Sequence, residues 1–298
     1  MPVYNGEEFL EQALDSILGQ TFADFSLIVS DNASTDRTPE ILEAYAARDD
    51  RITVLRADAN RGAAWNYNRV FEGCATPYFK WAAADDLLAP TCVERLLDVL
   101  QAAPPSVVLA YPRTRVVDER GEPVGELVDD LATGPGASVT ARFRKVVANV
   151  LWGNLVFALM RTEALKRTRL HGSFPSSDHV LLAELALIGS FVEVPELLFL
   201  RRRHAGMSRL ANTSAADASA FFDPAAEPVL DEFGCVYREH LLAIDRADLT
   251  PSERRRVRAA FFATWALRRA KLDPRVMRVR SALRIRTRAR RFVARLRR

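Results

Sequence analysis

The chain has 298 residues, so it is long enough for one large α/β domain or for one domain with an appendage. It contains no run of about 18 uninterrupted apolar residues and no charged-then-apolar leader, which argues against a membrane-spanning helix and against secretion. The net charge of +4 hides an asymmetry, because residues 275–298 carry 11 Arg and no acid while the rest of the chain carries 31 basic and 38 acidic side chains.

The first hundred residues predict alternating helices and strands. Apolar residues at helical spacing indicate a helix within 7–19, and an apolar run indicates a buried strand at 25–30. The order then repeats with a helix opening at 36–39, a strand at 52–55, a helix at 63–72, a strand ending before Asp85, a helix at 90–101 and a strand at 107–111. This alternation predicts an α/β fold with a doubly wound, mostly parallel sheet flanked by helices.

The second half of the chain is less regular. A Gly-, Pro- and Asp-rich stretch predicts a long loop at 121–136. The elements expected after it are a helix at 141–150, a strand at 155–160, a helix at 178–188 and a strand at 197–201. Only helices are expected beyond about residue 212. We therefore divide the chain into an α/β domain at 1–214 and a helical region with an Arg-rich tail at 215–298.

Two adjacent carboxylates, Asp85 and Asp86, follow the aromatic-rich run at 78–84, where a strand should end. Ligands of open α/β sheets bind at that edge. Paired carboxylates can hold Mg²⁺ or Mn²⁺ against a diphosphate, since these cations prefer oxygen ligands shared between protein and substrate. The pair thus favours a nucleotide-dependent transferase. The alternative is that Asp85 caps the helix that begins at Pro90.

Four segments carry motifs in a fixed order: PVYNGEEFL at 2–10, SDNASTDRT at 30–38, NRGAAWNYN at 60–68 and AADDLLAP at 83–90. In this order and spacing they resemble the family 2 inverting glycosyltransferases with the GT-A fold. The resemblance covers roughly residues 1–210. It implies a GT-A catalytic domain, followed here by a helical, basic C-terminal extension.

The resemblance implies a donor-binding role for the first segments. Pro2, Tyr4 and Asn5 belong to the first segment, in which Tyr4 matches the residue that stacks on the nucleotide base. Asp31 matches the residue that hydrogen-bonds the uracil-like edge or the ribose, and Asn32 shapes the same loop.

Other readings of the second and third segments remain open from the residues alone. Arg61 matches a basic residue that faces the donor, and an exposed Arg on a helix face is the alternative. The loop containing Asp31 could equally be a turn with Asp36 as a helix cap.

The fourth segment corresponds to the family's Asp-x-Asp-Asp metal motif, with Ala83 in place of the first carboxylate. The resemblance implies that Asp85 is the principal ligand of a divalent cation, Mg²⁺ or Mn²⁺. Asp86 would be a second ligand or lie just outside the ligand shell. Both would also face the donor.

Two later segments complete the expected site. SSDHVLLAEL at 176–185 matches the acidic helix under the acceptor, which implies that Asp178 is the base that deprotonates the acceptor in a direct displacement. The alternative is that Ser176 or Ser177 caps this helix and Asp178 only favours its positive end. RRRHAGMSR at 201–209 resembles the family's mobile loop, which implies that His204 approaches the diphosphate or the metal.

The two ends of the chain differ from the family pattern. Members have a buried strand directly before Pro-Val-Tyr-Asn, and only Met1 precedes Pro2 here, so we expect the natural start to lie upstream. In the tail, apolar residues lie along one helical face amid arginines, which predicts an interfacial helix on an anionic membrane surface. A disordered basic tail is the next alternative, and a nucleic-acid arm is the least favoured.

We therefore predict an inverting glycosyltransferase that moves a sugar from a nucleotide-diphosphate sugar to a glycan, lipid-linked or small-molecule acceptor. Bacterial cell-envelope polysaccharide synthesis is the expected setting. The protein is expected in the cytoplasm, peripheral on the inner face of the plasma membrane. The alternatives are a catalytically inactive nucleotide-sugar-binding protein and a nucleotidyltransferase, although the latter should carry a Gly-rich phosphate loop that PVYNGEEF lacks.

Overall fold

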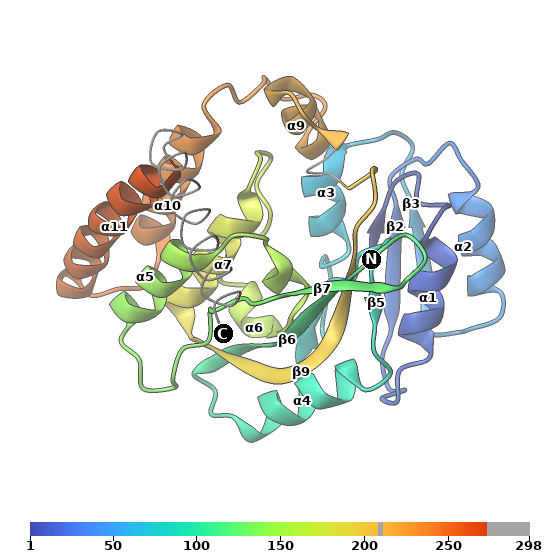
Figure 1. Ribbon diagram of the computed structural model, residues 1–298, viewed down its shortest axis with the longest axis horizontal. Helices are drawn as coiled ribbons and strands as arrows, with labels where there is room; N and C mark the ends of the chain where they lie inside the picture. Colours follow the sequence, from blue (N-terminus) through green and yellow to red (C-terminus); the bar gives the residue numbers. More distant parts are fainter. Residues whose placement is uncertain (208–210, 273–298) are drawn as a thin grey trace, which may run out of the picture.

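The computed structural model describes residues 1–207 and 211–272, and its strands form two sheets covered by helices (Figure 1). The first sheet is parallel and consists of β1 (Pro2–Val3), β2 (Leu27–Asp31) and β3 (Ile52–Arg56). Its connections contain α1 (Leu10–Leu18) and α2 (Thr38–Ala46), and α3 (Gly62–Arg69) follows β3. The α/β fold expected from the alternation is confirmed.

The second sheet has the order β4-β8-β6-β9-β5, and β7 also pairs with β6. Its strands are β4 (Tyr78–Phe79), β5 (Leu87–Leu88), β6 (Val107–Val117), β7 (Pro123–Leu127), β8 (Leu159–Arg161) and β9 (Ser190–Arg202). Only β6 and β9 are parallel among the pairs of this sheet. The expected mostly parallel arrangement is therefore found in the first sheet and between β6 and β9, whereas the other pairs of the second sheet are antiparallel.

Two segments differ from the predicted elements for local reasons. The expected loop at 121–136 contains β7, which a short turn joins to β6 as an antiparallel hairpin. Its residues are almost all exposed, so they show no alternation of apolar and polar side chains. The expected strand at 155–160 is split into a 3₁₀ turn, η1 (Asn154–Phe157), and the short β8.

The remaining helices form the second half of the molecule. They are α4 (Cys92–Ala102), α5 (Val139–Asn149), α6 (Thr162–Leu165), α7 (Ser177–Ile188), α9 (Ala215–Phe222), α10 (Glu232–Arg246) and α11 (Pro251–Leu272). α7 is buried along most of its length. α5 and α10 pack against it, and α11 packs on α5 and α10, within one hydrophobic core (Figure 1). α9 packs instead on α3, where the carbonyl oxygen of Phe222 would lie 2.3 Å from a Cβ at Gly62.

The structure describes the first residues of the sequence and not the Arg-rich tail. Met1 is buried, its amino group donates a hydrogen bond to the Ile28 carbonyl at 2.6 Å, and burial lowers the pKa of this amine to about 5. The predicted interfacial helix in the tail lies outside the described residues. Within the described ranges, no helix is both long enough and apolar enough to cross a membrane.

Candidate functional site

The loops that follow β1 and β2 are joined into one unit. The Asn5 backbone N–H donates to Ser34 Oγ at 2.9 Å, and Asn5 Oδ1 accepts from the Thr35 N–H at 2.8 Å. Gly6 N–H donates to Thr38 Oγ1 at 2.9 Å. These bonds hold the first two motifs together at the carboxyl ends of parallel strands. Tyr4 lies between them with 46% of its surface exposed, so its ring is available to a ligand.

Asp31 and Asn32 are buried at the end of β2, and each is bonded to protein. Asp31 Oδ1 accepts from the Ser34 N–H at 2.9 Å, and Arg56 lies 3.7 Å from Oδ2. Asn32 Nδ2 donates to Asn60 Oδ1 at 2.8 Å, and Asn32 Oδ1 accepts from the Arg61 N–H at 3.0 Å. Asn32 thus fixes the loop that carries Arg61.

Arg61 itself is exposed, as the alternative drawn from the sequence also requires. Its guanidinium carbon lies 4.9 Å from the centre of the Trp65 ring. The pairing with this ring orients the side chain along α3 without burying its charge.

Asp85 and Asp86 differ sharply in exposure and partners. The Asp85 side chain is 38% exposed, and its Oδ2 lies 3.0 Å from His204 Nε2. Asp86 is buried, and its Oδ1 accepts from the Arg202 N–H at 2.8 Å. α4 begins at Cys92 with Thr91 in the capping position. The interpretation of Asp85 as a cap of that helix is therefore wrong.

The electrostatics of this pair follow from its burial. Burial, together with the neighbouring charge of Asp85, holds the pKa of the Asp86 carboxyl well above its usual range. The hydrogen bond to Asp85 raises the pKa of His204. Asp85 is therefore the carboxylate of the pair that a ligand can reach from solvent, and Asp86 is buried next to it.

A fully buried guanidinium holds the acidic pair in place. Arg202 Nε donates to the Asp85 carbonyl at 2.9 Å, Nη1 to the Glu119 carbonyl at 2.7 Å and Nη2 to Gln12 Oε1 at 2.7 Å. Reasoning from the sequence missed Arg202, because the three consecutive arginines at 201–203 carry no local signal that tells the buried one from its neighbours.

Asp178 lies in the first turn of α7, which begins after Ser176 in a left-handed conformation with φ of 62°. Ser176 makes no capping hydrogen bond, and the Ser177 hydroxyl is buried without a partner among the described residues. The serine-cap interpretation is therefore wrong. Asp178 packs against Gly153, where an added Cβ would lie 1.9 Å from Asp178 Oδ2.

Tyr67 lies in α3, and its pKa is affected by the acidic pair and by Asp178. Burial raises the pKa of its phenol, and the charges of Asp85, Asp86 and Asp178 each raise it further. All three carboxylates therefore act on one side chain of α3. The sequence had assigned Tyr67 no role, although it lies within the NRGAAWNYN motif.

His171 lies behind Tyr67, with 4.8 Å between the ring centres. Burial lowers the pKa of this imidazole to about 4, although the charge of Asp178 opposes the shift. His171 is therefore neutral near pH 7 and does not form an ion pair with a carboxylate. No motif pointed to this residue.

A second chain of contacts begins at Arg201. Its guanidinium donates to Asn154 Oδ1 and, at 3.1 Å, to the Trp152 carbonyl. Asn154 Nδ2 donates to Asp129 Oδ2 at 3.0 Å, and burial raises the pKa of Asp129. The charge of Arg201 also lowers the pKa of Asp86, which partly offsets the repulsion between the Asp85 and Asp86 carboxylates. This cation close to the acidic pair was also missed.

The donor set fits a cation that a substrate helps to hold. Among residues 1–207 and 211–272, no three His, Cys, Asp or Glu side chains form a group that could hold a metal by themselves. Mg²⁺ and Mn²⁺ sites often use one or two carboxylates together with substrate phosphates. Asp85, with Asp86 behind it, matches that incomplete set.

A family model described as Glycosyl transferase family 2 matches residues 1–168, more than half of the chain. The curated relative EpsJ of Bacillus subtilis, an uncharacterized glycosyltransferase, is 35% identical over 98 residues, which are 33% of this chain and 28% of EpsJ. TuaG of the same organism, a putative teichuronic acid biosynthesis glycosyltransferase, is 27% identical over 127 residues, 43% of this chain and 50% of TuaG. The chain thus spans half or less of these relatives.

Solved structures show the fold. S. aureus TarS 1–349 in complex with UDP-GlcNAc matches with a TM-score of 0.65 and 16% identity, over 88% of this chain and 70% of that one. The mannosyltransferase PcManGT from Pyrobaculum calidifontis, in complex with GDP-Man and Mn²⁺, matches with a TM-score of 0.54 and 18% identity, over 92% and 79%. With its α/β architecture of the GT-A type and a family model that covers more than half of its length, the chain belongs to glycosyl transferase family 2.

Proposed function

We propose that the chain is a glycosyltransferase that moves a sugar from a nucleotide-diphosphate sugar to an acceptor hydroxyl with inversion at the anomeric carbon. The observation that carries the proposal is that two consecutive residues of β9 reach both acidic groups. Arg202 bonds Asp85 and Asp86, while Arg201 bonds Trp152 and Asn154 on either side of Gly153, against which Asp178 packs. These contacts support placing a cation-type acidic pair near a base-type carboxylate. The donor class is supported by the UDP-GlcNAc in TarS and the GDP-Man in PcManGT.

The donor nucleotide would lie over the joined loops after β1 and β2. Tyr4 offers an exposed ring for stacking on the base, between β1, which contains Pro2, and Asn5, which is bonded to the neighbouring loop. Asp31 offers carboxylate oxygens for the ribose or the base edge at the end of β2. Asn32 would act through the loop that it holds by accepting from the Arg61 N–H, and the exposed Arg61 side chain would contact the donor phosphates from its place beside Trp65.

Asp85 would hold Mg²⁺ or Mn²⁺ together with the donor diphosphate, with Asp86 as the second carboxylate. The bound cation would neutralise charge that develops on the leaving diphosphate. His204, which already contacts Asp85, lies where it can donate a hydrogen bond to a phosphate oxygen. Arg202 keeps the backbone of the pair fixed throughout, so little reorganisation is needed when the donor binds.

Asp178 would accept the proton of the acceptor hydroxyl as that oxygen attacks the anomeric carbon. The neutral imidazole of His171 leaves the carboxylate free to take this proton. The Asp178 carboxylate occupies space that a side chain at position 153 would fill, and the glycine there leaves it open. The base therefore stands on the rigid, buried α7, while the donor side is built from loops.

The acceptor would be a glycan, a lipid-linked or a small-molecule hydroxyl compound. The printed name of TuaG supports bacterial cell-envelope polysaccharide synthesis as the setting. Such an acceptor would be met at the cytoplasmic face of the membrane, where the Arg-rich tail could contact anionic lipid.

A thermal-shift titration tests the proposal. UDP or GDP with Mn²⁺ should raise the unfolding temperature of the wild type and of Asp178→Asn, because a ligand that binds only the folded state stabilises it. Asp85→Asn should lose the Mn²⁺-dependent part of the shift. Asp98→Asn, which removes an exposed carboxylate from α4, is the matched control. If neither nucleotide shifts the wild type with Mn²⁺ present, the proposed donor site is wrong.

A further inference from the structure

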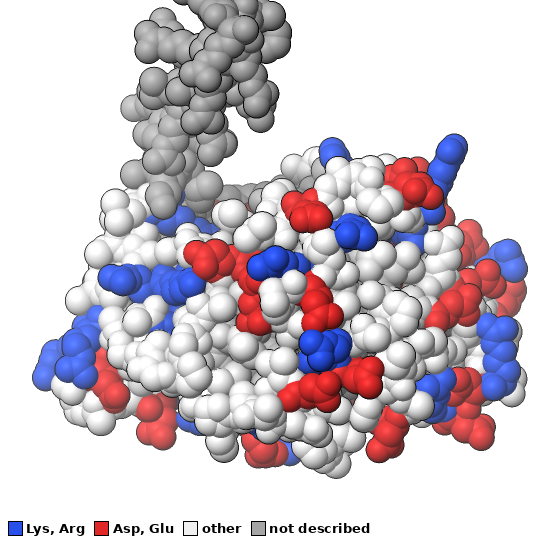
Figure 2. Space-filling model, turned by 60° about the horizontal axis from the view of Figure 1, so that its bottom comes forward, with Lys and Arg blue, Asp and Glu red and all other residues white. Residues whose placement is uncertain are grey.

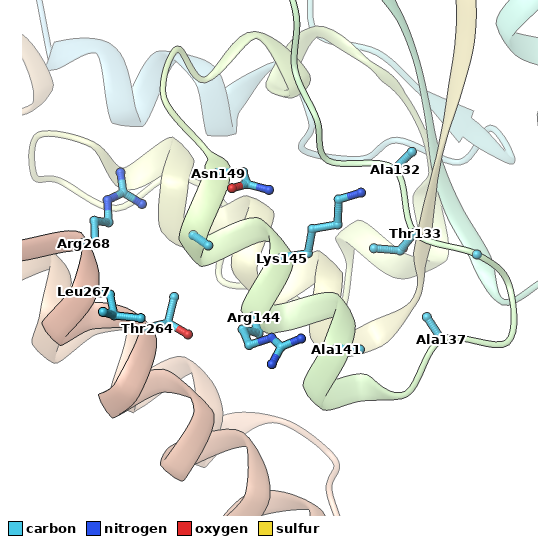
Figure 3. Close-up of a pocket in the computed structure, with 12 residues that line it drawn as sticks. Ala132, Thr133, Ala137, Ala141, Arg144, Lys145, Asn149, Thr264, Leu267 and Arg268 are labelled. Atoms are coloured by element: carbon cyan, nitrogen blue, oxygen red, sulfur yellow. The ribbon is translucent and has the colours of Figure 1, made fainter. Parts of the chain in front are cut away.

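A pocket of about 640 Å³ lies away from the candidate active site, between the 132–137 segment, α5 and α11 (Figure 3). Arg144, Lys145 and Arg268 contribute the charges of its wall, and none of its twelve lining residues is acidic. In Figure 2, basic side chains, with some acidic ones beside them, lie at the left end of the molecule, the end at which Figure 1 places these two helices. The pocket is thus a concave surface of one sign of charge.

α5 is anchored on one side and offers its basic residues on the other. Arg142 donates to the carbonyls of Ala186 and Leu187 in α7 at 2.9 and 3.1 Å, which fixes α5 against the core. Arg144 is exposed and has no ion-pair or hydrogen-bond partner within the described part of the chain. Its five N–H donors are therefore available to a ligand in the pocket.

The two other cations are held at the rim. Lys145 forms an ion pair with Asp130 at 2.8 Å, and the Asp130 side chain is 72% exposed, so this pair is weak and exchangeable. Arg268 donates to the carbonyls of Val147 and Val150 at the end of α5, at 2.6 and 2.9 Å. Arg268 is thus placed by backbone contacts, and among residues 1–207 and 211–272 no carboxylate forms an ion pair with it.

A hydroxyl donor completes the lining. Thr133 Oγ1 accepts a hydrogen bond from the Phe191 N–H at 3.1 Å, which leaves its own proton free for an acceptor in the pocket. The pocket is therefore lined by hydrogen-bond donors, namely an ammonium, guanidinium groups and a hydroxyl. Such donors suit a ligand that is anionic and rich in acceptor oxygens.

We propose that this pocket binds a phosphate group, carried by a soluble ligand or by the headgroup of an anionic lipid. A phosphate presents acceptor oxygens in a geometry that the guanidinium fork of Arg144 matches, and Lys145 adds a point charge.

The test measures phosphate binding by the full-length chain at constant ionic strength, by calorimetric titration with inorganic phosphate and by co-sedimentation with phosphatidylglycerol vesicles against pure phosphatidylcholine vesicles. Arg144→Gln/Lys145→Gln should weaken binding about tenfold or more, since two charge-assisted hydrogen-bond donors are lost. Ala141→Leu, which fills the pocket and keeps all charges, should weaken it as well. Binding of phosphate alone identifies a soluble ligand, and pocket-dependent binding of vesicles identifies a headgroup.

The matched control is Arg255→Gln/Arg256→Gln, which removes two exposed charges from α11 outside the pocket. It should bind both probes like the wild type. Equal loss in the control and in Arg144→Gln/Lys145→Gln would show a general charge effect and overturn the proposal. Unchanged binding by Arg144→Gln/Lys145→Gln and Ala141→Leu would overturn it too. Unfolding temperatures measured without phosphate show that each variant is folded.

Discussion

Gly153 gives Asp178 its space: a Cβ at position 153 would lie 1.9 Å from Asp178 Oδ2, closer than any side chain tolerates. The glycine also has φ of 66°, a left-handed conformation that a side chain disfavours. The position of the proposed base is thus set from outside its own helix, by a residue in the loop before η1.

Gly153→Ala should therefore displace Asp178 and lower kcat about 100-fold, because a shift of about 1 Å in a reacting group has an effect of that size. The KM for the donor should change little, since the donor loops lie on other elements. Gly73→Ala is the matched control: Gly73 has φ of 72°, so it shares the backbone strain, but a Cβ there meets nothing within 4 Å. Equal loss of kcat in both variants would assign the effect to strain alone.

Asp178→Asn keeps the shape of the side chain and removes its capacity to take a proton. We expect kcat for sugar transfer to fall by about 10²–10⁴-fold, the usual contribution of a general base. Mn²⁺-dependent binding of UDP or GDP, measured by thermal shift, should be unchanged. Transfer at the wild-type rate would move the base to another residue.

Arg202→Met should destabilise the fold by about 3 kcal/mol, because the fully buried guanidinium is lost and the carbonyl groups of Asp85 and Glu119 lose their donor. The free energy of unfolding in urea measures this loss. Arg203→Met is the matched control, since Arg203 is the exposed neighbour of the same residue type. A cost for Arg203→Met as large as that for Arg202→Met would contradict the role given to the buried guanidinium.

His171 and His240 predict a loss of stability in acid. Burial lowers the pKa of each imidazole from 6.5 to about 4. Between these values the unfolded chain binds protons that the folded chain does not, so their contribution is complete above pH 6.5 and is lost as the pH falls toward 4. The effect is roughly 1.4 kcal/mol per pKa unit for each residue.

The measurement is the free energy of unfolding from pH 7.5 to 4.5 for the wild type and for His240→Phe. Phenylalanine keeps the stacking with Phe261 but cannot bind a proton, so the slope below pH 6.5 should decrease. An unchanged slope would show that His240 does not contribute to the acid sensitivity.

The elements that could be predicted from the sequence are those with a local pattern of burial. α1 has Leu10, Ala13, Leu14 and Ile17 buried on one face, as the helical spacing predicts. β7 could not be predicted, because an exposed edge strand has no apolar face to reveal it. The direction of the strands in the second sheet depends on connections that composition does not encode.

The same distinction applies to the site. Asp31 ends β2, as its motif and the preceding apolar run predict. The strand expected to end before Asp85 stops at Phe79, so Asp85 lies in the irregular segment between β4 and β5 and could be predicted only from its motif. The roles given to both residues stay predictions. Arg202 and His171 are both buried, and burial at these positions is set by contacts between residues far apart in sequence, which a local pattern does not reveal. Of the alternative drawn for Asp36, the turn is found, since Asp36 Oδ1 accepts from the Thr38 N–H at 3.0 Å. The helix cap is not, because Arg37 occupies the capping position of α2.

The segment after β7 contributes residues beside the candidate site and to the basic pocket. Asp129 bonds Asn154 beside the candidate site, and Thr133, four residues later, lines the basic pocket. Between them Leu131 is buried, and its N–H donates to the Tyr111 hydroxyl, which itself donates to the Asp129 carbonyl. Ligands at the two places would restrict one and the same short stretch of backbone. Occupancy of either should therefore change the affinity of the other, by the same factor in both directions.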